Sequence, residues 1–507
     1  MFIRENKNRS GSVSIQIISK ESGNYRLVKT IGSGKTPQEI AFLKQRAQQE
    51  INKHQGSISL FVSDTDAVVE SFLSDLSNAQ IQVIGPELIF GRIYDAIGFN
   101  QVPEELFRHL VICRLYHPGS KLKTIDYLQR FLGVYKQVDE IYRFLDTLQS
   151  HHKKLVEQIA FEHTQGVLGG RPRIVFYDLT TLHFEASDED DLRKTGFSKV
   201  GKHQNPQIYI GLLVGLHGLP IGYDMFEGNI SEGHTLIPIL EKFSKRFDIG
   251  KPIVVADAGL LNKANLEHLQ DHGYEFILGA RIKNETDKIR HTITCQHWSD
   301  GKNIRIDKGN GLTLIVSYSD KRARKDAHTR QRGLQRLEKK VKSGKLSKAN
   351  INNRGYNKYL RLSGDVAITI DYDKFAQDTL WDGLKGYVTN SQLPSDQIID
   401  NYQYLWQIEK AFRISKTDLQ IRPIYHRLRH RIEGHLCIAF TAYSIYKELE
   451  RVLQKEQADM SVTRAADLTH NMYQLNVVLP DSDEHKSILL NMDDEQAKLY
   501  QIIQKNF

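Results

Sequence analysis

The chain has 507 residues, too many for one ordinary core, and its hydrophobic fraction of 40% argues against wholesale disorder, so we expect about two to four folded units. Lys and Arg exceed Asp and Glu by 69 − 61 = 8, which favours a polyanionic partner without requiring one. The three cysteines lie far apart in the sequence, which argues against a disulfide framework and a thiolate zinc site. We expect no secretory leader and find no apolar stretch long enough to cross a bilayer, so we expect a cytoplasmic protein.

The first part of the chain predicts two small units. Residues 12–31 alternate around an SGN turn, which predicts a β-hairpin, followed by a charged helix at about 37–54 and further strand near 56–84. From Gly85 to about Gly166 the apolar spacing becomes helical, interrupted by the loop HPGSK at 117–121. We therefore expect an N-terminal unit at 1–84 and an all-helical domain at 85–168 that binds DNA or supports oligomerisation.

Strands and helices alternate after Arg171. RIVFYD at 173–178 and KPIVVADAGL at 251–260 are buried strands that lead to an acid, and 207–226 predicts two strands joined at His217 and Gly218. Helices are expected at 233–247 and after Asn262. This alternation predicts an α/β layer structure over 169–282.

The later part of the chain interrupts and then resumes this pattern. Residues 283–385 hold short strands around a long, highly charged helical segment at 320–348, which predicts a β-rich insertion. Two amphipathic helices at 396–416 and 427–454 follow, so the core is expected to resume over 386–455. A mixed C-terminal tail covers 456–507.

Asp178 and Asp257 are the first candidates for chemistry. Both are expected at the C-terminal ends of buried strands, the edge at which α/β sheets collect their ligands. Carboxylates there suit a hard divalent cation, and two adjacent ions would activate an attacking oxygen and stabilise the leaving oxygen. The alternative is that each aspartate caps a turn or the next helix.

A third acid lies on the predicted helix at 402–416. Glu409, Arg413 and Lys416 are spaced by four and then three residues, so they share one helix face. The carboxylate would complete a metal shell, and the cations would hold the phosphates of the scissile strand. The alternative is a solvent-exposed Glu–Arg pair.

This helix resembles the signature of insertion-sequence DDE transposases of the IS-four type, Tyr-x2-Arg-x3-Glu-x6-Lys. Tyr402, Glu409 and Lys416 fall in register with it, whereas Leu405 stands at the Arg position. Further blocks at 177–185, 196–213, 218–235 and 254–261 are similar to those around the family's first two aspartates, and 119–128 and 425–443 are similar to flanking segments. Together they cover most of residues 85–450, in the subgroup with a long N-terminal region.

The resemblance implies an RNase H-like catalytic core, a mixed sheet flanked by helices, interrupted by the insertion and preceded by the hairpin unit and the helical domain. It implies a catalytic and metal-binding triad of Asp178, Asp257 and Glu409, with two Mg²⁺ or Mn²⁺ ions. It also implies cleavage and strand transfer on double-stranded DNA, at terminal inverted repeats and a target, by a homodimer in the bacterial nucleoid. The gap of 409 − 257 = 152 residues, against 257 − 178 = 79, leaves room for the insertion.

Charge concentrates in that insertion. Between Asp320 and Lys348 there are twelve Lys or Arg and three Asp or Glu, a net of 12 − 3 = +9, against +8 for the whole chain. We expect a clamp on the DNA backbone, although a solvated charged helix is the simpler alternative. The DNA-binding candidates are Tyr402, Arg413, Lys416, Lys321, Arg322, Arg324, Lys325, Arg330, Arg332 and Trp298. Trp298 would stack on a flipped base, while Trp406 is expected in the core.

Other enzyme classes find less support. His183, His203, His217, His234 and His435 form no HxxxH or HExxH pattern, which argues against a zinc hydrolase, and no GxxxxGK[ST] motif implies ATP. Two alternatives to a transposase remain. One is an RNase H-like nuclease or junction resolvase that uses the same triad, and the other is a catalytically inactive, transposase-derived DNA-binding regulator.

Overall fold

The computed structural model describes the chain except for residues 9–10, 22, 55–68, 70–72, 75, 199–200, 202, 248, 261, 345, 347–349, 353–354, 364–366 and 479–483. The chain forms two compact units, one of Met1–Gln82 with Tyr473–Leu490 and one of Val83–Met472 with Asn491–Phe507. Most of the strand expected near 56–84 falls outside the described residues, and β4 (Ile81–Val83) is the strand found there. Among the described residues, no helix is long and apolar enough to cross a membrane.

The first unit contains the predicted hairpin. The strands β2 (Val13–Glu21) and β3 (Asn24–Gly34) pair antiparallel, and β1 (Phe2–Lys7) adds a third strand beside β2. The helix α1 (Pro37–His54) packs on this sheet, so that Ile15 and Ile17 are buried with Ala47 and Ile51. A second three-stranded sheet has the order β16-β15-β4, with β15 at Tyr473–Val478 and β16 at His485–Leu489.

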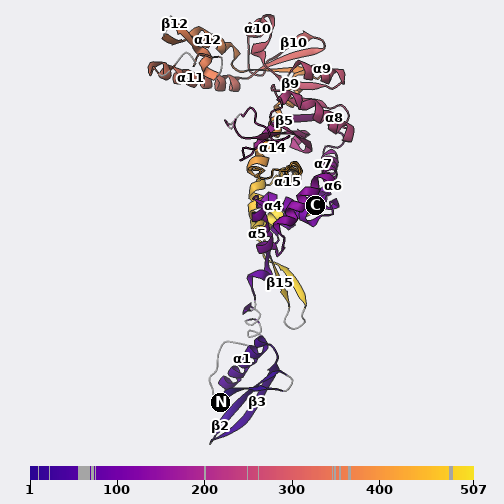
Figure 1. Cartoon of the computed structure of the whole chain (residues 1–507), viewed down its shortest axis with the longest axis vertical. Coiled ribbons are helices and arrows are strands. Elements are labelled where there is room, and N and C mark those ends of the chain that lie inside the picture. The colour runs from indigo at the N-terminus through magenta and orange to yellow at the C-terminus, as the bar shows by residue number, and fades with distance from the viewer. Residues whose placement is uncertain are drawn as a thin grey trace. The chain divides into compact units, whose positions relative to one another are not determined.

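The helical segment of the second unit surrounds one long helix, α15 (Arg429–Lys455) (Figure 1). Its helices are α3 (Arg92–Ile97), α4 (Glu105–Tyr116), α5 (Lys121–Leu132), α6 (Val138–His151) and α7 (Lys153–Val167). All residues of α15 from 432 to 449 are buried, because α4, α6 and α7 contact it and so does the strand β7. The amphipathic helix predicted at 427–454 is therefore a helix enclosed on all sides.

An eight-stranded mixed sheet has the order β10-β11-β14-β9-β8-β5-β6-β7. Pairing is antiparallel along β5-β6-β7, parallel along β5-β8-β9, and antiparallel from β9 through β14 and β11 to β10. Its strands are β5 (Ile174–His183), β6 (Gln207–Val214), β7 (Pro220–Glu227), β8 (Ile253–Ala256), β9 (Phe276–Ala280), β10 (Asn303–Gly309), β11 (Leu312–Tyr318) and β14 (Leu384–Thr389).

Helices cover both faces of this sheet, as the side-chain alternation along β5 shows. Phe176 and Leu182 belong to the core that includes α15, whereas Val175 and Tyr177 pack with Phe243 of α8 (Leu236–Phe247). Successive strand residues point to opposite faces, so a strand that is apolar at both sets of positions must be covered twice. The helices α9 (Lys263–Asp271) and α10 (Asp287–Thr294) follow β8 and β9 along the chain.

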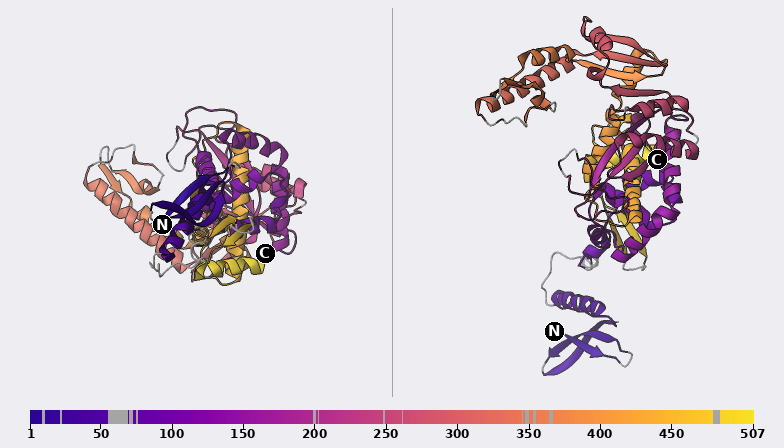
Figure 2. Two further views of the ribbon diagram at one scale, coloured as in Figure 1. Left: turned by 90° about the horizontal axis from the view of Figure 1, so that it is seen from below. Right: turned by 45° about the horizontal axis from the view of Figure 1, so that its top comes forward.

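The insertion divides between the sheet and a small cluster of its own. The strands β10, β11 and β14 extend the main sheet rather than forming a separate β-domain. The remaining elements, α11 (Asp320–Lys342), β12 (Leu360–Ser363), β13 (Ala367–Ile370) and α12 (Tyr372–Gln377), gather around Leu334, Leu337 and Tyr359 (Figure 2). The helix α11, with 23 residues, confirms the long helix expected in the charged segment at 320–348.

The helix expected at 396–416 is broken in two. The helix α13 (Ser395–Gln403) ends before Tyr404, and α14 (Trp406–Thr417) begins after Leu405. Hydrogen bonds from Leu405 N to Tyr402 O and from Ile408 N to Leu405 O span three residues rather than four, which tightens the turn. Because of this turn, Tyr402, Leu405 and Ile408 are all buried. The C-terminal region adds α16 (Val462–Thr469) and α17 (Asp494–Asn506).

Candidate active site

Strand register aligns the first two acids. The parallel pairing of β5 with β8 runs from Ile174 opposite Ile253 to Tyr177 opposite Ala256, and the next residues are Asp178 and Asp257. Asp257 directly follows its strand, as predicted. The prediction for Asp178 is wrong in detail, because β5 continues to His183 beside β6. Asp178 instead lies where β5 extends beyond its parallel neighbour, which leaves both carboxylates at one level of the sheet.

Tyr402 connects α13 to the second acid. Its hydroxyl donates a hydrogen bond to Asp257 Oδ1 at 3.1 Å. Burial is the main cause that raises the pKa of Tyr402 far above its usual value, followed by the charge and hydrogen bond of Asp257. The phenol therefore stays protonated at neutral pH and serves as a fixed donor that orients the Asp257 carboxylate. The signature tyrosine thus holds an acid in place.

The helix α14 lies against β5 and carries the third acid. It contacts the strand, and Lys416 Nζ donates a hydrogen bond to Thr180 Oγ1, which points to the same face of β5 as Asp178. Glu409 lies on the exposed part of α14, in its first turn. Its charge acts on Tyr402 and on Lys385, the same two residues that Asp257 influences.

Lys385 is the site residue that sequence reasoning missed. It lies on β14 with its ammonium 4.3 Å from the centre of the Tyr402 ring. Burial and then the nearby Arg322 lower the pKa of Lys385, whereas the charges of Asp257 and Glu409 raise it. Lys385 therefore stands between the carboxylates and the basic helix α11. A lysine near the start of the apolar strand LKGYVT was the one local signal for it.

A cleft of about 690 Å³ adjoins this lysine. Its walls are the start of α11, the strands β11 and β14, and the helix α13. Lys321, Arg322 and Lys325 of α11 line it together with Lys385, and so do the acids Asp326 of α11, Asp300, Asp396 and Asp400. Three of the predicted DNA-binding residues therefore line one cleft together with Lys385.

The other predicted DNA-binding residues have different surroundings. Arg324, Arg332 and Arg413 are exposed. Arg330 is not free, because its guanidinium pairs with Asp382 and lies 5.3 Å from the centre of the Phe375 ring.

The two tryptophans differ from the sequence prediction, which expected Trp298 to be free to stack on a base and Trp406 to lie in the core. Trp298 is half-buried, donates its indole N–H to Ile293 O at 3.0 Å and stacks on Tyr318 at 6.2 Å. Trp406, which was expected in the core, is 53% exposed.

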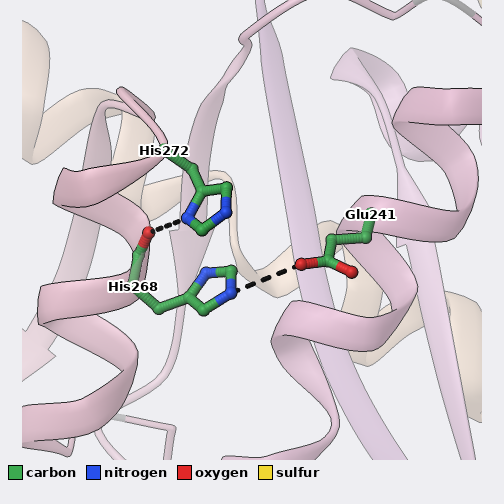
Figure 3. Close-up of side chains that lie close together, drawn as sticks. All are labelled: Glu241, His268 and His272. Carbon is green, nitrogen blue, oxygen red and sulfur yellow. Dashed lines mark hydrogen bonds and ion pairs between the residues drawn. The ribbon is translucent and has the colours of Figure 1, made fainter.

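A separate group of possible metal ligands lies on α8 and α9. His268 Nε2 is 3.3 Å from Glu241, and the rings of His268 and His272 stack at 4.0 Å (Figure 3). In the described part of the chain, this is the group whose three ligand atoms all lie within 4.8 Å of one another, and the Asp178, Asp257 and Glu409 set is not that compact. Two imidazoles and a carboxylate suit zinc better than magnesium. The HxxxH spacing of His268 and His272 was a signal that the sequence survey overlooked.

Comparison with known proteins identifies the family. Residues 169–445 match the family model described as the transposase DDE domain, which covers more than half of the chain. Over 133 residues the chain is 29% identical to the transposase for insertion sequence element IS231E of Bacillus thuringiensis subsp. finitimus. That match spans 24% of this chain and only 27% of the relative.

A solved structure, the cryo-EM structure of a piggyBac transposase synaptic complex with hairpin DNA, aligns with 72% of this chain and 69% of its own. At 10% identity and a TM-score of 0.40 the resemblance is too distant to assign a fold or a function. The family match rests instead on the segment that contains β5, β8 and α14, and therefore all three acids. The chain belongs to the transposase DDE domain family.

Proposed function

We propose that this protein is a transposase that cleaves the ends of its insertion sequence and joins them to target DNA, using Asp178, Asp257 and Glu409 as metal ligands. The observation that carries the proposal is the alignment of Asp178 with Asp257 on parallel neighbours. Glu409 is tied to this pair through Tyr402 and Lys385, on which both Asp257 and Glu409 act. In this proposal, three acids from separate elements would supply metal ligands at the end of the parallel strands.

The strand arrangement supports an RNase H-like core as part of the proposal. The order β7-β6-β5-β8-β9, with the first three strands antiparallel and the last three parallel, is the arrangement expected for such a core. We propose that its two parts span 169–282 and 386–455, separated by the insertion. In this assignment Asp178 lies on the first core strand and Asp257 follows the fourth.

The donor set fits magnesium. Three carboxylates offer hard oxygen ligands, and Mg²⁺ needs only one or two of them besides water and phosphate oxygens. Two bound ions would activate the attacking oxygen and stabilise the leaving oxygen. The chain itself does the positioning: Tyr402 orients Asp257, and Lys416 fixes α14 against Thr180. Lys385 balances the carboxylates on the side from which DNA would approach.

DNA binding is proposed for the cleft beside the acids. Lys321, Arg322 and Lys325 share a face of α11 and would contact backbone phosphates through point charges and forked guanidinium donors. Arg324, Arg332 and Arg413 are exposed and can extend this contact, whereas Arg330 is engaged inside the protein. Holding two inverted repeats together would require a homodimer in the active complex.

The test is cleavage by acid-to-amide variants. Asp178→Asn, Asp257→Asn and Glu409→Gln should each reduce Mg²⁺-dependent cutting of labelled terminal-repeat DNA by at least about 10³-fold, because each removes a ligand charge while keeping shape. Binding of the same DNA should remain. The matched control is Glu267→Gln on the exposed surface of α9, which should cut normally. Undiminished cutting by any of the three variants would refute the triad.

Strand transfer separates a transposase from a nuclease that uses the same acids. Terminal-repeat DNA that already carries free 3′-hydroxyl ends needs no cleavage, so its joining to a plasmid reports the second reaction alone. The proposal expects joined product from the wild-type protein and none from the acid variants. Cutting without any joining would identify a nuclease or resolvase, and DNA binding without either reaction would identify a regulator.

A further inference from the structure

A pocket of about 460 Å³ lies in the helical part of the second unit, where no predicted site residue falls. Its walls are the end of α4, the start of α5, Tyr142 of α6 and the chain between α14 and α15. Six basic side chains line it, namely Arg114, Lys121, Lys123, Arg422, His426 and His435. Among the residues that the structure describes around the pocket, none is an aspartate or glutamate. The pocket is therefore basic without an internal counter-charge.

Three of these basic side chains are buried. Arg114, Lys121 and His435 are exposed by only 5%, 7% and 6%. The guanidinium of Arg114 donates to the Gln420 carbonyl at 3.4 Å, and His435 Nε2 lies 3.0 Å from the Ile421 carbonyl. His435 Nδ1 is buried without a partner. Buried cations normally have an anionic or hydrogen-bonding partner, so the pocket lacks a counter-charge for its basic side chains.

The cations also repel one another. Burial lowers the pKa of Lys121 well below its usual value, and the charge of Arg114 lowers it further. Burial, Arg114 and Lys121 act in the same direction on His435. Among the described residues, Asp146 is the acid that acts on His426 in the pocket, and it is already hydrogen-bonded to His430 and Arg431. An anion in the pocket would relieve all of these repulsions together.

The start of α5 adds donors at the same place. Ser120 caps this helix by accepting a hydrogen bond from Lys123 N at 3.3 Å. The N–H groups of Lys121 and Leu122 belong to the first turn, which has no intrahelical acceptors, and both residues line the pocket. The helix dipole places partial positive charge there, which favours a phosphate.

We propose that this pocket binds a phosphate group of the DNA backbone, held by Lys121, Arg114 and the N-terminus of α5. The identity of the ligand as DNA rests on the proposed function, whereas the anion site rests on the pocket itself. Tyr142 and Tyr425 line the opening, and Tyr425 is 73% exposed, so a sugar or base adjoining the phosphate has an aromatic surface to contact.

The helix α14 relates the pocket to the acids. Glu409 lies near its start, and the chain beyond its end supplies Gln420 and Arg422 to the pocket. The eight helical steps from Glu409 to Thr417 span roughly 12 Å at 1.5 Å per residue. The pocket is therefore placed to hold DNA beside the cleavage position rather than the scissile phosphate itself.

Inorganic phosphate is the first probe, added to the full chain at ionic strength matched with chloride. Millimolar phosphate should raise the melting temperature of the wild-type protein, and calorimetric titration should give a single site. Lys121→Met should lower phosphate affinity at least about 10-fold and abolish the shift in melting temperature. Without phosphate this variant should melt higher than wild type, because a buried cation on which no described carboxylate acts has been removed. An equal phosphate response in Lys121→Met and wild type would overturn the site.

Two substitutions at exposed residues provide a second test in which misfolding is not expected. Lys123 and Arg130 both lie on the exposed surface of α5, but only Lys123 lines the pocket. Lys123→Met should lower phosphate affinity several-fold, whereas Arg130→Met should leave it unchanged. Equal effects of the two substitutions would mean that phosphate responds to general charge, which also overturns the proposal.

The second experiment measures the binding constant of a terminal-repeat DNA duplex at several salt concentrations. Each lost phosphate contact reduces the slope of log K against log salt by about 1, so Lys121→Met should show that decrease and Arg130→Met should not. Phosphate binding with an unchanged DNA slope would overturn the backbone assignment. The acid variants provide the separation from the proposed function, because they should bind phosphate normally even if the transposase assignment failed.

Discussion

The acid-bearing end of the parallel strands and the basic pocket at the start of α5 hold half-buried and buried cations in opposite electrostatic situations. Lys385 is half-buried, and the charges of Asp257 and Glu409 offset part of the effect of its burial. Lys121 is more deeply buried, next to Arg114, and no described carboxylate acts on it. The first region is balanced within the chain, whereas the second needs a ligand from outside.

This difference indicates what each region can do. A cation near carboxylates keeps the local charge balanced until a metal ion binds to those carboxylates and a DNA phosphate binds beside them. Cations held apart from any carboxylate are costly in the free protein and become favourable only when an anion arrives. Stability is thus exchanged for binding in the pocket. On α11 a paired and a solvent-exposed arginine lie two residues apart, at Arg330 and Arg332.

The largest expected effect concerns Lys385. Replacing it by Met should reduce DNA cleavage by about 10²-fold, because a positioned positive group beside the acids is lost. Binding of terminal-repeat DNA should change much less, since the cleft retains Lys321, Arg322 and Lys325. Single-turnover cleavage with Mg²⁺ measures the effect. The control is Lys374→Met, an exposed lysine of α12, and equal cleavage by both variants would remove Lys385 from the site.

The next effect concerns the ion pair of Arg330 and Asp382, whose side chains are 12% and 17% exposed. Arg330→Met should lower the free energy of unfolding by about 2 kcal/mol, because Asp382 is left nearly buried without its partner. Urea denaturation measures this loss. Arg332→Met, two residues away and exposed, should stay within about 0.5 kcal/mol of wild type. An unchanged free energy of unfolding in Arg330→Met would show that the ion pair does not contribute to stability.

A pH effect of similar size is expected at His426. Burial, Lys121, Arg431 and Arg114 lower the pKa of His426 to about 4, below its unfolded value near 6.5. Between these values the unfolded chain binds the proton and the folded protein does not, so stability falls as pH decreases from about 6.5 to about 4. The loss should reach about 2 kcal/mol, since the side chain is partly exposed.

Asparagine at this position tests the pH effect. His426→Asn should flatten the decline measured by thermal denaturation between pH 6.5 and 4 in phosphate-free buffer. The exposed His151→Asn on α6 should keep the wild-type decline. Identical profiles for all three proteins would place the acid sensitivity elsewhere.

The smallest effect is the salt dependence of DNA binding by Arg332→Met. An exposed arginine that contacts one phosphate should reduce the slope of log K against log salt by about 1, without altering stability. Arg330→Met should leave that slope unchanged because its guanidinium is occupied by Asp382. A smaller slope in Arg330→Met together with an unchanged slope in Arg332→Met would contradict the view that Arg330 is occupied by Asp382 and that Arg332 is exposed and can bind DNA.

Local sequence patterns were sufficient for many of the elements. The alternation at 12–31 predicted β2 and β3, and the apolar run before Asp257 predicted β8, because each pattern records which side chains one segment buries. The charge of α11 was equally local, since it needs only a count of lysines and arginines. The family and the three acids followed from the blocks that resemble DDE transposases, and the family match covers them.

Other features depended on partners far along the chain. The extension of β5 beyond Asp178 depends on pairing with β6, and the tight turn before Leu405 buries three side chains that a continuous helix would spread apart. The helix α15 looked amphipathic because its sequence does not record that the helices and β7 enclose both sides.

The sequence by itself therefore determined many of the periodic strands and helices, the basic segment and the family, since these depend on neighbouring residues or on a recognisable motif. Tertiary structure alone decided that Asp178 and Asp257 share one level of the sheet, that Lys385 joins them from 128 residues beyond Asp257, and that Lys121 has no acid beside it (385 − 257 = 128). The physical reason is that a side chain's charge is local, whereas what compensates it depends on segments that only folding brings together.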